Sequence, residues 1–399
     1  MESYGLISTI CGAIVLAFVF GAVARRFRLS PILGYLLAGV AVGPFTPGFV
    51  GDTNLALQLA EIGVILLMFG VGLKFSLADL WSVRLVALPG ALVQMGVATG
   101  LGYLVGTLMG LDAAESLMLG FSLSVASTVV LLRELEDRKL LKTENGRISV
   151  GWLVIEDIAI VLAIVLLPLL AAMAHGETGS APETLGAFGL TALKIGAFVA
   201  LMLLVGARLF PWLIVRVAHL RSRELMSLGT LSLALGVAFI AYFLFQASFA
   251  LGAFLAGVVL NRSKFTHSIA EDSQPLRDTF AVLFFVSVGM LFDPMTLVRS
   301  PASVAGVVAI IVIGKGLAAF VITSLFRLPL ETSLLVAIAL AQIGEFSFVL
   351  ADMGRRLELL SIETYNLILG GALISIALNP FLFRAVEAWR GRRRIGGTG

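Results

Sequence analysis

The sequence predicts an all-α polytopic membrane protein with thirteen transmembrane helices. Three observations support this fold class: 59% of the 399 residues are hydrophobic, only 13% are charged, and the mean hydropathy is +1.03. This composition excludes a soluble multidomain protein, a disordered chain and a collagen-like fibre. Because lipid offers no hydrogen-bonding partner to the backbone, the long apolar runs are expected to cross the membrane as helices.

Charges, prolines and turn residues divide the chain into thirteen apolar segments. No basic residue precedes the first segment and no clear small-residue cleavage site follows it, so we expect a retained helix rather than a signal peptide. Residues 267–272, between two segments, are expected to form a solvated, charged loop. In chain order the predicted spans are residues 5–24, 31–47, 55–73, 85–109, 115–132, 148–173, 186–207, 225–245, 248–261, 277–292, 302–325, 332–351 and 362–383.

The basic residues predict the orientation of these spans. Of the 28 Lys and Arg, 23 fall on connections of one side, and three, Arg299, Arg355 and Arg356, fall on the other. The remaining two, Lys194 and Lys315, lie within segments. Since basic residues concentrate on the cytoplasmic side, the N-terminus is predicted outside and the C-terminus in the cytoplasm.

Two short sequence segments recur later in the chain at nearly the same spacing, which indicates an internal repeat. LGYLLAGV at 33–40 matches LGAFLAGV at 251–258, and VGLKF at 71–75 matches VGMLF at 288–292. The two offsets are 218 and 217 residues, and an odd number of helices, seven, separates the copies. Helices 2–6 and 9–13 are therefore predicted to be inverted repeats, an arrangement typical of secondary transporters.

Two adjacent acids and one lysine lie deep in predicted spans. Asp157 is ten residues from Arg147, which places it about 15 Å into a membrane core about 30 Å thick. Glu156 precedes it, and Lys315 lies about 18 Å from Arg327 in its own span. An ionised carboxylate at that depth costs roughly 2.5–3.5 kcal/mol, so these acids require a cation, a proton or a buried partner. Glu156 could pair with Lys315, and a purely structural ion pair is the alternative to a transport site.

Two spans contain polar interruptions at equivalent positions of the repeats. Hydroxyls crowd the fifth span at Ser122, Ser124, Ser127 and Thr128, and Gln342, Gly344 and Glu345 interrupt the twelfth. Adding the repeat offset of 217 to 127 gives 344. Hydroxyl-rich helices can also serve packing alone, but the shared offset favours two discontinuous helices that cross at a transport site. Glu345 is expected to support the break rather than to bind the ion, and Gln94 is expected to serve packing.

Several classes of chemistry are excluded by what the sequence lacks. A single cysteine, Cys11, and three histidines give no disulfide and no zinc or haem ligand set. Neither a His-Glu-x-x-His nor a Gly-x-Ser-x-Gly motif is present, so the chain is not expected to be an enzyme. We expect no cofactor and no nucleic-acid partner, and membrane lipid as the surrounding medium.

Taken together, these motifs resemble the transmembrane domain of the cation:proton antiporter-2 family, in its potassium-efflux (Kef) and YbaL-like branch. The resemblance covers nearly all of the predicted helices. It rests on FGVGL at 69–73, SLSVASTVV at 122–130, Glu156-Asp157, AFLAGV at 253–258, LFFVSVGM at 283–290, Lys315 and AQIGEFSF at 341–348.

The resemblance implies a sodium/proton-antiporter-like fold in a bacterial inner membrane, a homodimer and an elevator-type mechanism. The moving core bundle would comprise about 85–173 and 302–385, and the dimerisation scaffold about 5–73 and 225–292. Asp157 would bind the monovalent cation and the proton in turn, with Glu156, Ser127 and Thr128 as further ion ligands and Lys315 as charge partner. Relatives often continue into a cytoplasmic nucleotide-binding regulatory domain, which we expect to be missing here.

These observations predict a secondary transporter that exchanges a monovalent cation for protons. Potassium is favoured by the resemblance and sodium is possible. One departure from the family leaves the ion and the coupling ratio open: relatives carry Asn-Asp or Gln-Asp where this chain has Glu156-Asp157. A gated cation efflux channel and a sodium-coupled organic-anion symporter on a related fold are the alternative functions.

Overall fold

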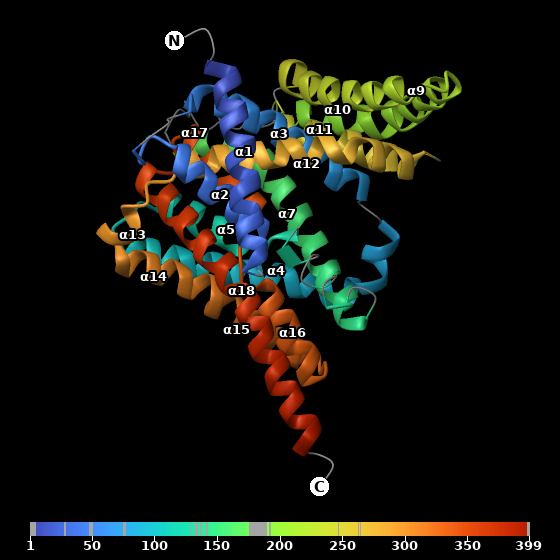
Figure 1. Ribbon diagram of the computed structural model, residues 1–399. Helices are drawn as coiled ribbons and strands as arrows, with labels where there is room; N and C mark the ends of the chain where they lie inside the picture. Colours follow the sequence, from blue (N-terminus) through green and yellow to red (C-terminus); the bar gives the residue numbers. More distant parts are fainter. Residues whose placement is uncertain are drawn as a thin grey trace. The chain divides into compact units, whose positions relative to one another are not determined.

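The described part of the chain is helical apart from short connections (Figure 1). The computed structural model describes residues 5–396 except 28, 48–50, 75–76, 129, 132–134, 136–137, 141–142, 175–189, 191–192, 246, 262 and 264. The first half contains α1 (Gly5–Arg26), α2 (Pro31–Val42), α3 (Thr53–Lys74), α4 (Leu77–Leu108), α5 (Ala113–Ser124), α7 (Glu144–Ala174), η2 (Met202–Gly206) and α9 (Ala207–His219). The second contains α10 (Arg223–Phe245), α11 (Phe249–Asn261), α12 (Thr266–Met290), α13 (Thr296–Arg299), α14 (Pro301–Ala309), η3 (Ile310–Gly314), α15 (Lys315–Leu325), α16 (Leu330–Leu340), α17 (Glu345–Arg356) and α18 (Ile362–Gly396).

Many of these helices have the length and composition of membrane spans. Within the described residues, seven helices are long and apolar enough to cross a bilayer, and α2, α11 and α16 are shorter apolar helices. A hydrocarbon core about 30 Å thick requires about 20 helical residues, which the shorter helices do not supply alone. The polytopic helical fold is thus confirmed, whereas the number of thirteen spans stays a prediction.

Local signals explain several helix boundaries. Proline occupies the first turn of α2 and of α14, where its missing N–H removes no intrahelical bond. Asp112 caps α5 by accepting a 2.8 Å hydrogen bond from the Glu115 N–H. Arg221 and Arg327, with positive φ angles of 52° and 56°, follow the ends of α9 and α15.

Two sequence-based boundaries are wrong. Helix α4 begins at Leu77 rather than at residue 85, and α12 begins at Thr266, so the predicted loop at 267–272 is helical. Hydropathy detects only the apolar part of a helix, whereas the polar first turns of α12 belong to the same continuous helix. The Arg277 guanidinium also donates a 3.3 Å bond back to the carbonyl of Ala270 within these turns.

The chain divides into two compact units, each described by itself. Unit 1 comprises Met1–Ile14, Gly51–Ser76 and Val161–Val288. In it α11 packs against α3, α9 and α10, and Figure 1 labels all four helices. Unit 2 comprises Val15–Val50, Leu77–Ile160 and Gly289–Gly399, with α4 packed on α5 and α15, and α18 packed on α14, α16 and α17. The predicted core and scaffold bundles have other bounds than these two units, and that division stays a prediction.

The repeated sequence motifs make the same backbone contact in both units. A Cβ atom built on Gly72 of α3 would lie 2.2 Å from the carbonyl oxygen of Phe254 and 3.0 Å from Gly257 Cα in α11. A Cβ atom built on Gly289 would lie 2.1 Å from the Leu36 oxygen and 3.0 Å from Gly39 Cα in α2. Only glycine permits two backbones to approach this closely. Residues that are 217 or 218 positions apart therefore make equivalent contacts here.

Candidate ion-binding site

The first predicted interruption is present in unit 2. Helix α5 ends at Ser124, Val125 is extended with φ −98° and ψ 134°, and the helical conformation resumes at Thr128. Ser127 starts the new turn, because its hydroxyl accepts a 3.1 Å hydrogen bond from the Val130 N–H. Serine residues favour a helix break of this kind, because their hydroxyls can replace the backbone hydrogen bonds that the helix would otherwise make.

The second interruption lies between α16 and α17. Helix α16 ends at Leu340, and α17 begins at Glu345 after the extended Gly344. The two breaks touch: a Cβ atom on Gly344 would lie 2.1 Å from Ser127 Cβ and 2.6 Å from Ser127 Cα. The two discontinuous segments therefore meet at the pair of positions that the repeat offset of 217 residues relates.

The side chain of Gln342 joins the two breaks. Its amide oxygen accepts a 3.1 Å bond from the Ser127 N–H, and its amide nitrogen donates to the Ser127 carbonyl at 3.2 Å and to the Ala339 carbonyl at 3.4 Å. Gln342 is fully buried. One side chain thus bonds to both the N–H and the carbonyl of Ser127 at the first break.

Asp157 lies on α7 beside the first break. Its side chain is 6% exposed, and the Thr128 hydroxyl lies 3.3 Å from each carboxylate oxygen. A carboxylate and a hydroxyl at the end of an interrupted helix are oxygen donors of the kind that a dehydrated alkali cation requires. Of the predicted ion ligands, the structure brings together Asp157 and Thr128.

Glu156 faces the same break from the neighbouring position. One of its carboxylate oxygens accepts a 2.8 Å hydrogen bond from the Ala126 N–H, and the side chain is fully buried. The other oxygen, Oε1, has no hydrogen-bond partner among the described residues. A buried polar atom without a partner is costly, and it is expected where a proton, water or ion belongs.

Lys315 begins α15 directly after the π-helical turn η3, and it too is fully buried. Its ammonium donates a 3.0 Å bond to the Gln342 carbonyl at the end of α16. The direct pairing of Glu156 with Lys315 that the sequence suggested is not formed, since no ion pair within 4.0 Å joins these two described residues. Instead the acid binds an N–H group at one break and the base binds a carbonyl at the other, which matches the partial charges of helix ends.

Two features of the site had no clear sequence signal. Gln94, predicted as a packing residue, donates a 3.0 Å bond to the Ser124 carbonyl at the end of α5 and accepts a 3.2 Å bond from the Trp152 indole N–H. All three residues are buried. The π-helical turn before Lys315 is the second feature, and turns of this kind often occur at functional sites.

The remaining predictions for the site stand as follows. Ser127 is buried and caps the resumed helix, so its role as an ion ligand stays a prediction. Glu345 provides the first helical residue of α17, and its side chain lies outside the described residues. Within the part of the chain that the structure describes, no group of three or more His, Cys, Asp or Glu could hold a metal ion.

Comparison with known proteins shows the family of this chain. The model of the transmembrane sodium/hydrogen exchanger family matches residues 14–388, which is nearly the whole chain. The chain belongs to the sodium/hydrogen exchanger family. It is 54% identical over 385 residues to the putative cation/proton antiporter YbaL of Escherichia coli, covering 96% of this chain and 69% of that protein. This member of the exchanger family is therefore a multi-pass membrane protein whose relatives are transporters rather than enzymes.

Further relatives confirm the branch that the motifs indicated. The exchanger is 33% identical to K(+) efflux antiporter 4 of Arabidopsis thaliana over 94% of the chain, and 32% identical to the glutathione-regulated potassium-efflux protein KefC of Escherichia coli over 90%. It spans 63% and 57% of these two proteins. The chain thus belongs to the Kef and YbaL branch of the cation:proton antiporter-2 family.

A solved structure confirms the fold. The sodium proton antiporter MjNhaP1 of Methanocaldococcus jannaschii superposes with a TM-score of 0.74 at 16% identity, covering 97% of this chain and 99% of that one. At this level of identity the likeness extends to the fold alone.

Proposed function

We propose that this exchanger moves a monovalent cation across the membrane in exchange for protons, with Asp157 as the group that both ions occupy in turn. The observation that carries the proposal is the position of Asp157, nearly buried beside the point where two interrupted helices meet. The Thr128 hydroxyl lies beside its carboxylate and is a second oxygen ligand in this proposal, with the Ser127 hydroxyl and Glu156 as further candidate ligands.

The formal charges of the site support one-for-one exchange. Ionised Glu156 and Asp157 contribute two negative charges, and Lys315 contributes one positive charge, which leaves a net charge of −1 in the empty site. A proton or a monovalent cation at Asp157 brings this sum to zero. Because a charged group is costly inside the membrane, the neutralised site moves between the two faces more readily than the empty one. This restriction couples the two ion fluxes.

Glu156 decides the coupling ratio in this scheme. Its Oε1 has no hydrogen-bond partner among the described residues, and the buried Lys315 ammonium interacts electrostatically with its carboxylate. If Glu156 keeps its charge through the cycle, exchange is electroneutral. If Glu156 also releases a proton when the cation binds, two protons are exchanged for one cation and exchange is electrogenic.

Potassium is the cation we favour, with sodium as the alternative. The names of two relatives, KefC and K(+) efflux antiporter 4, refer to potassium efflux, whereas MjNhaP1 is a sodium proton antiporter. The experiment below compares the two ions directly.

The same proposal extends to the architecture. The equivalent contacts of Gly72 with α11 and Gly289 with α2, and the contact of Ser127 with Gly344, support inverted repeats within thirteen spans. We further propose an elevator-type movement of the predicted core bundle, 85–173 and 302–385, against a dimerisation scaffold of 5–73 and 225–292. The homodimer would lie in a bacterial inner membrane with the N-terminus outside and the C-terminus in the cytoplasm.

Transport by the purified protein in liposomes tests the proposal. A fixed pH jump is imposed with potassium, sodium or lithium outside, and internal pH and cation content are both recorded. We expect uphill cation movement in the wild type and none in Asp157→Asn. Glu363→Gln, at an exposed acid in the first turn of α18, serves as matched control and retains exchange.

The alternatives give different results in the same vesicles. A gated channel moves cations only down their electrochemical gradient, so a pH gradient alone would not concentrate them. A sodium-coupled symporter would take up sodium only when an organic anion is present, and a pH jump alone would not drive it. Retention of proton-coupled exchange by Asp157→Asn would remove the central assignment.

A further inference from the structure

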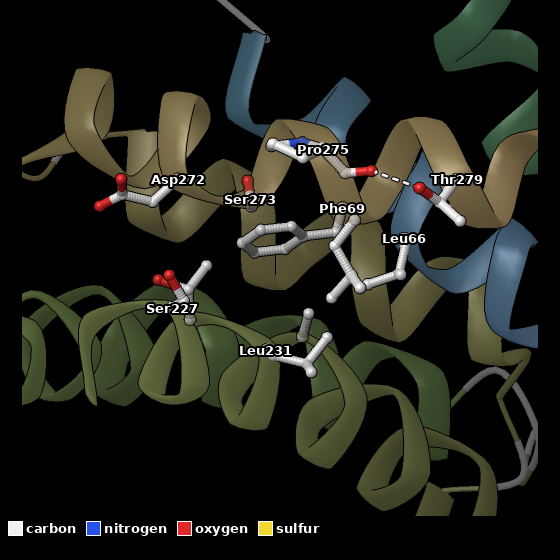
Figure 2. A pocket seen from close by; sticks show the side chains of 11 residues that line it. Leu66, Phe69, Ser227, Leu231, Asp272, Ser273, Pro275 and Thr279 are labelled. Carbon is white, nitrogen blue, oxygen red and sulfur yellow. Dashed lines mark hydrogen bonds between the residues drawn. The ribbon is translucent and has the colours of Figure 1, made fainter. Parts of the chain in front are cut away.

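Unit 1 contains a pocket that the transport site does not use. It has a volume of about 340 Å³ and lies among α3, α10 and α12. Figure 2 shows Phe69 and Leu66 of α3 between the two other helices, with Leu231 below them. This volume is at the lower end of small-molecule sites, which range over about 300–1,000 Å³. Its apolar walls suit one hydrocarbon chain.

The polar groups of this pocket are not all used by the protein. The hydroxyls of Ser273 and Thr279 donate to carbonyls of their own helix, at 3.3 and 2.8 Å. Thr230 of α10 differs, since it is 1% exposed and its hydroxyl has no hydrogen-bond partner among the described residues. A buried hydroxyl that lines a cavity and lacks a partner is a site at which a ligand oxygen is expected.

A charged pair lies at one end of the pocket. Asp272 lines it on α12, opposite Ser227 of α10, as Figure 2 shows. The Arg223 guanidinium at the start of α10 lies 3.5 Å from the Asp272 carboxylate, and the arginine side chain is 91% exposed. A guanidinium that is paired on one edge and otherwise exposed retains donors for a second anion.

The pocket lies near one end of the three helices that form it. Phe69 is close to the end of α3 at Lys74, Ser227 is close to the start of α10, and Asp272 lies in the first turns of α12. The connections at these ends carry basic residues and are therefore predicted to be cytoplasmic. An occupant would have its polar part at the cytoplasmic interface and its apolar part toward the membrane interior.

We propose that this pocket binds a phospholipid of the cytoplasmic leaflet that carries a primary ammonium in its headgroup. The ammonium would donate to Asp272 and the phosphate would accept from Arg223, so the opposite charges of the headgroup match the pair on the protein. Thr230 lies seven residues, about 10 Å, deeper along α10 than Arg223 and would donate to an ester carbonyl. One acyl chain would pack on Leu66, Phe69 and Leu231.

Lipid retention by the purified full-length chain tests this site without reference to transport. The protein is delipidated in detergent, mixed with equal amounts of phosphatidylethanolamine, phosphatidylcholine and phosphatidylglycerol, and analysed by native mass spectrometry. We expect phosphatidylethanolamine to be retained about tenfold over phosphatidylcholine, whose quaternary ammonium has no N–H to donate to Asp272. Equal retention of these two lipids, or a preference for phosphatidylglycerol, would overturn the proposal.

Isosteric variants identify the groups responsible. Asp272→Asn is expected to abolish the preference, and Thr230→Val to lower retention about threefold to tenfold. Asp278→Asn, at an exposed acid of α12 outside the pocket lining, is the matched control and should bind as the wild type does. If Asp272→Asn does not fold, Arg223→Gln tests the same headgroup. Variants that retain the lipid as well as the wild type would contradict the assignment of these residues.

Discussion

Replacing Gln342 by leucine removes the side chain that holds the two interruptions together. Three hydrogen bonds disappear, and the buried Ser127 N–H is left without its partner at 3.1 Å. The Ser127 carbonyl keeps one bond, because it also accepts from the Leu131 N–H at 3.1 Å. An orphaned buried donor costs about 1–3 kcal/mol and each of the two further lost bonds about 1 kcal/mol, so the total is about 3–5 kcal/mol.

Thermal unfolding in detergent and exchange in liposomes measure this effect together. Gln342→Leu is expected to lower the apparent Tm and to reduce the exchange rate, since the crossing that positions Asp157 and Thr128 loosens. Gln58→Leu is the matched control, because Gln58 is an exposed residue of α3. If Gln342→Leu has the Tm and the exchange rate of the control, the hydrogen bonds of Gln342 do not hold the crossing.

Three further substitutions test other contacts of the site. Gly344→Ala places a Cβ atom on the backbone of the other break and is expected to cost about 1–3 kcal/mol and most of the transport, whereas Gly96→Ala, with open space around it, leaves both unchanged. Lys315→Met should lower the Tm strongly because a buried acid loses its nearby cation, and adding Glu156→Gln should restore part of it; a double variant no more stable than the single one would contradict this coupling. Thr128→Val should weaken the apparent cation affinity about threefold to tenfold in a transport assay, and an unchanged affinity would exclude the hydroxyl as a ligand.

The positions of the interruptions could be predicted because polar residues break the apolar pattern at both of them. Similarity at an offset of 217 residues relates Ser127 to Gly344, and the structure brings these two residues into contact. Depth along a helix likewise follows from residue count, which is why Asp157, Glu156 and Lys315 were recognised as buried charges. Both predictions require only the positions of polar and charged residues within the apolar spans.

The partners of the buried charges could not be predicted in the same way. Glu156 and Lys315 have opposite charges and similar depth, so the sequence allows a direct pair between them. The broken helices offer each of them a closer backbone partner, the Ala126 N–H and the Gln342 carbonyl, and these depend on local backbone conformation. The bond from the Gln94 amide to the Ser124 carbonyl also depends on local backbone conformation, because that carbonyl loses its helical partner only where α5 ends.

Competition between protons and the cation tests the central claim most directly. Initial rates of cation uptake into proteoliposomes are measured over a range of cation concentrations at several external pH values. If both ions occupy the Asp157 carboxylate, acidification raises the apparent KM for the cation and leaves the maximal rate unchanged. A maximal rate that falls with acidification at constant KM would show that protons and cations bind to different groups.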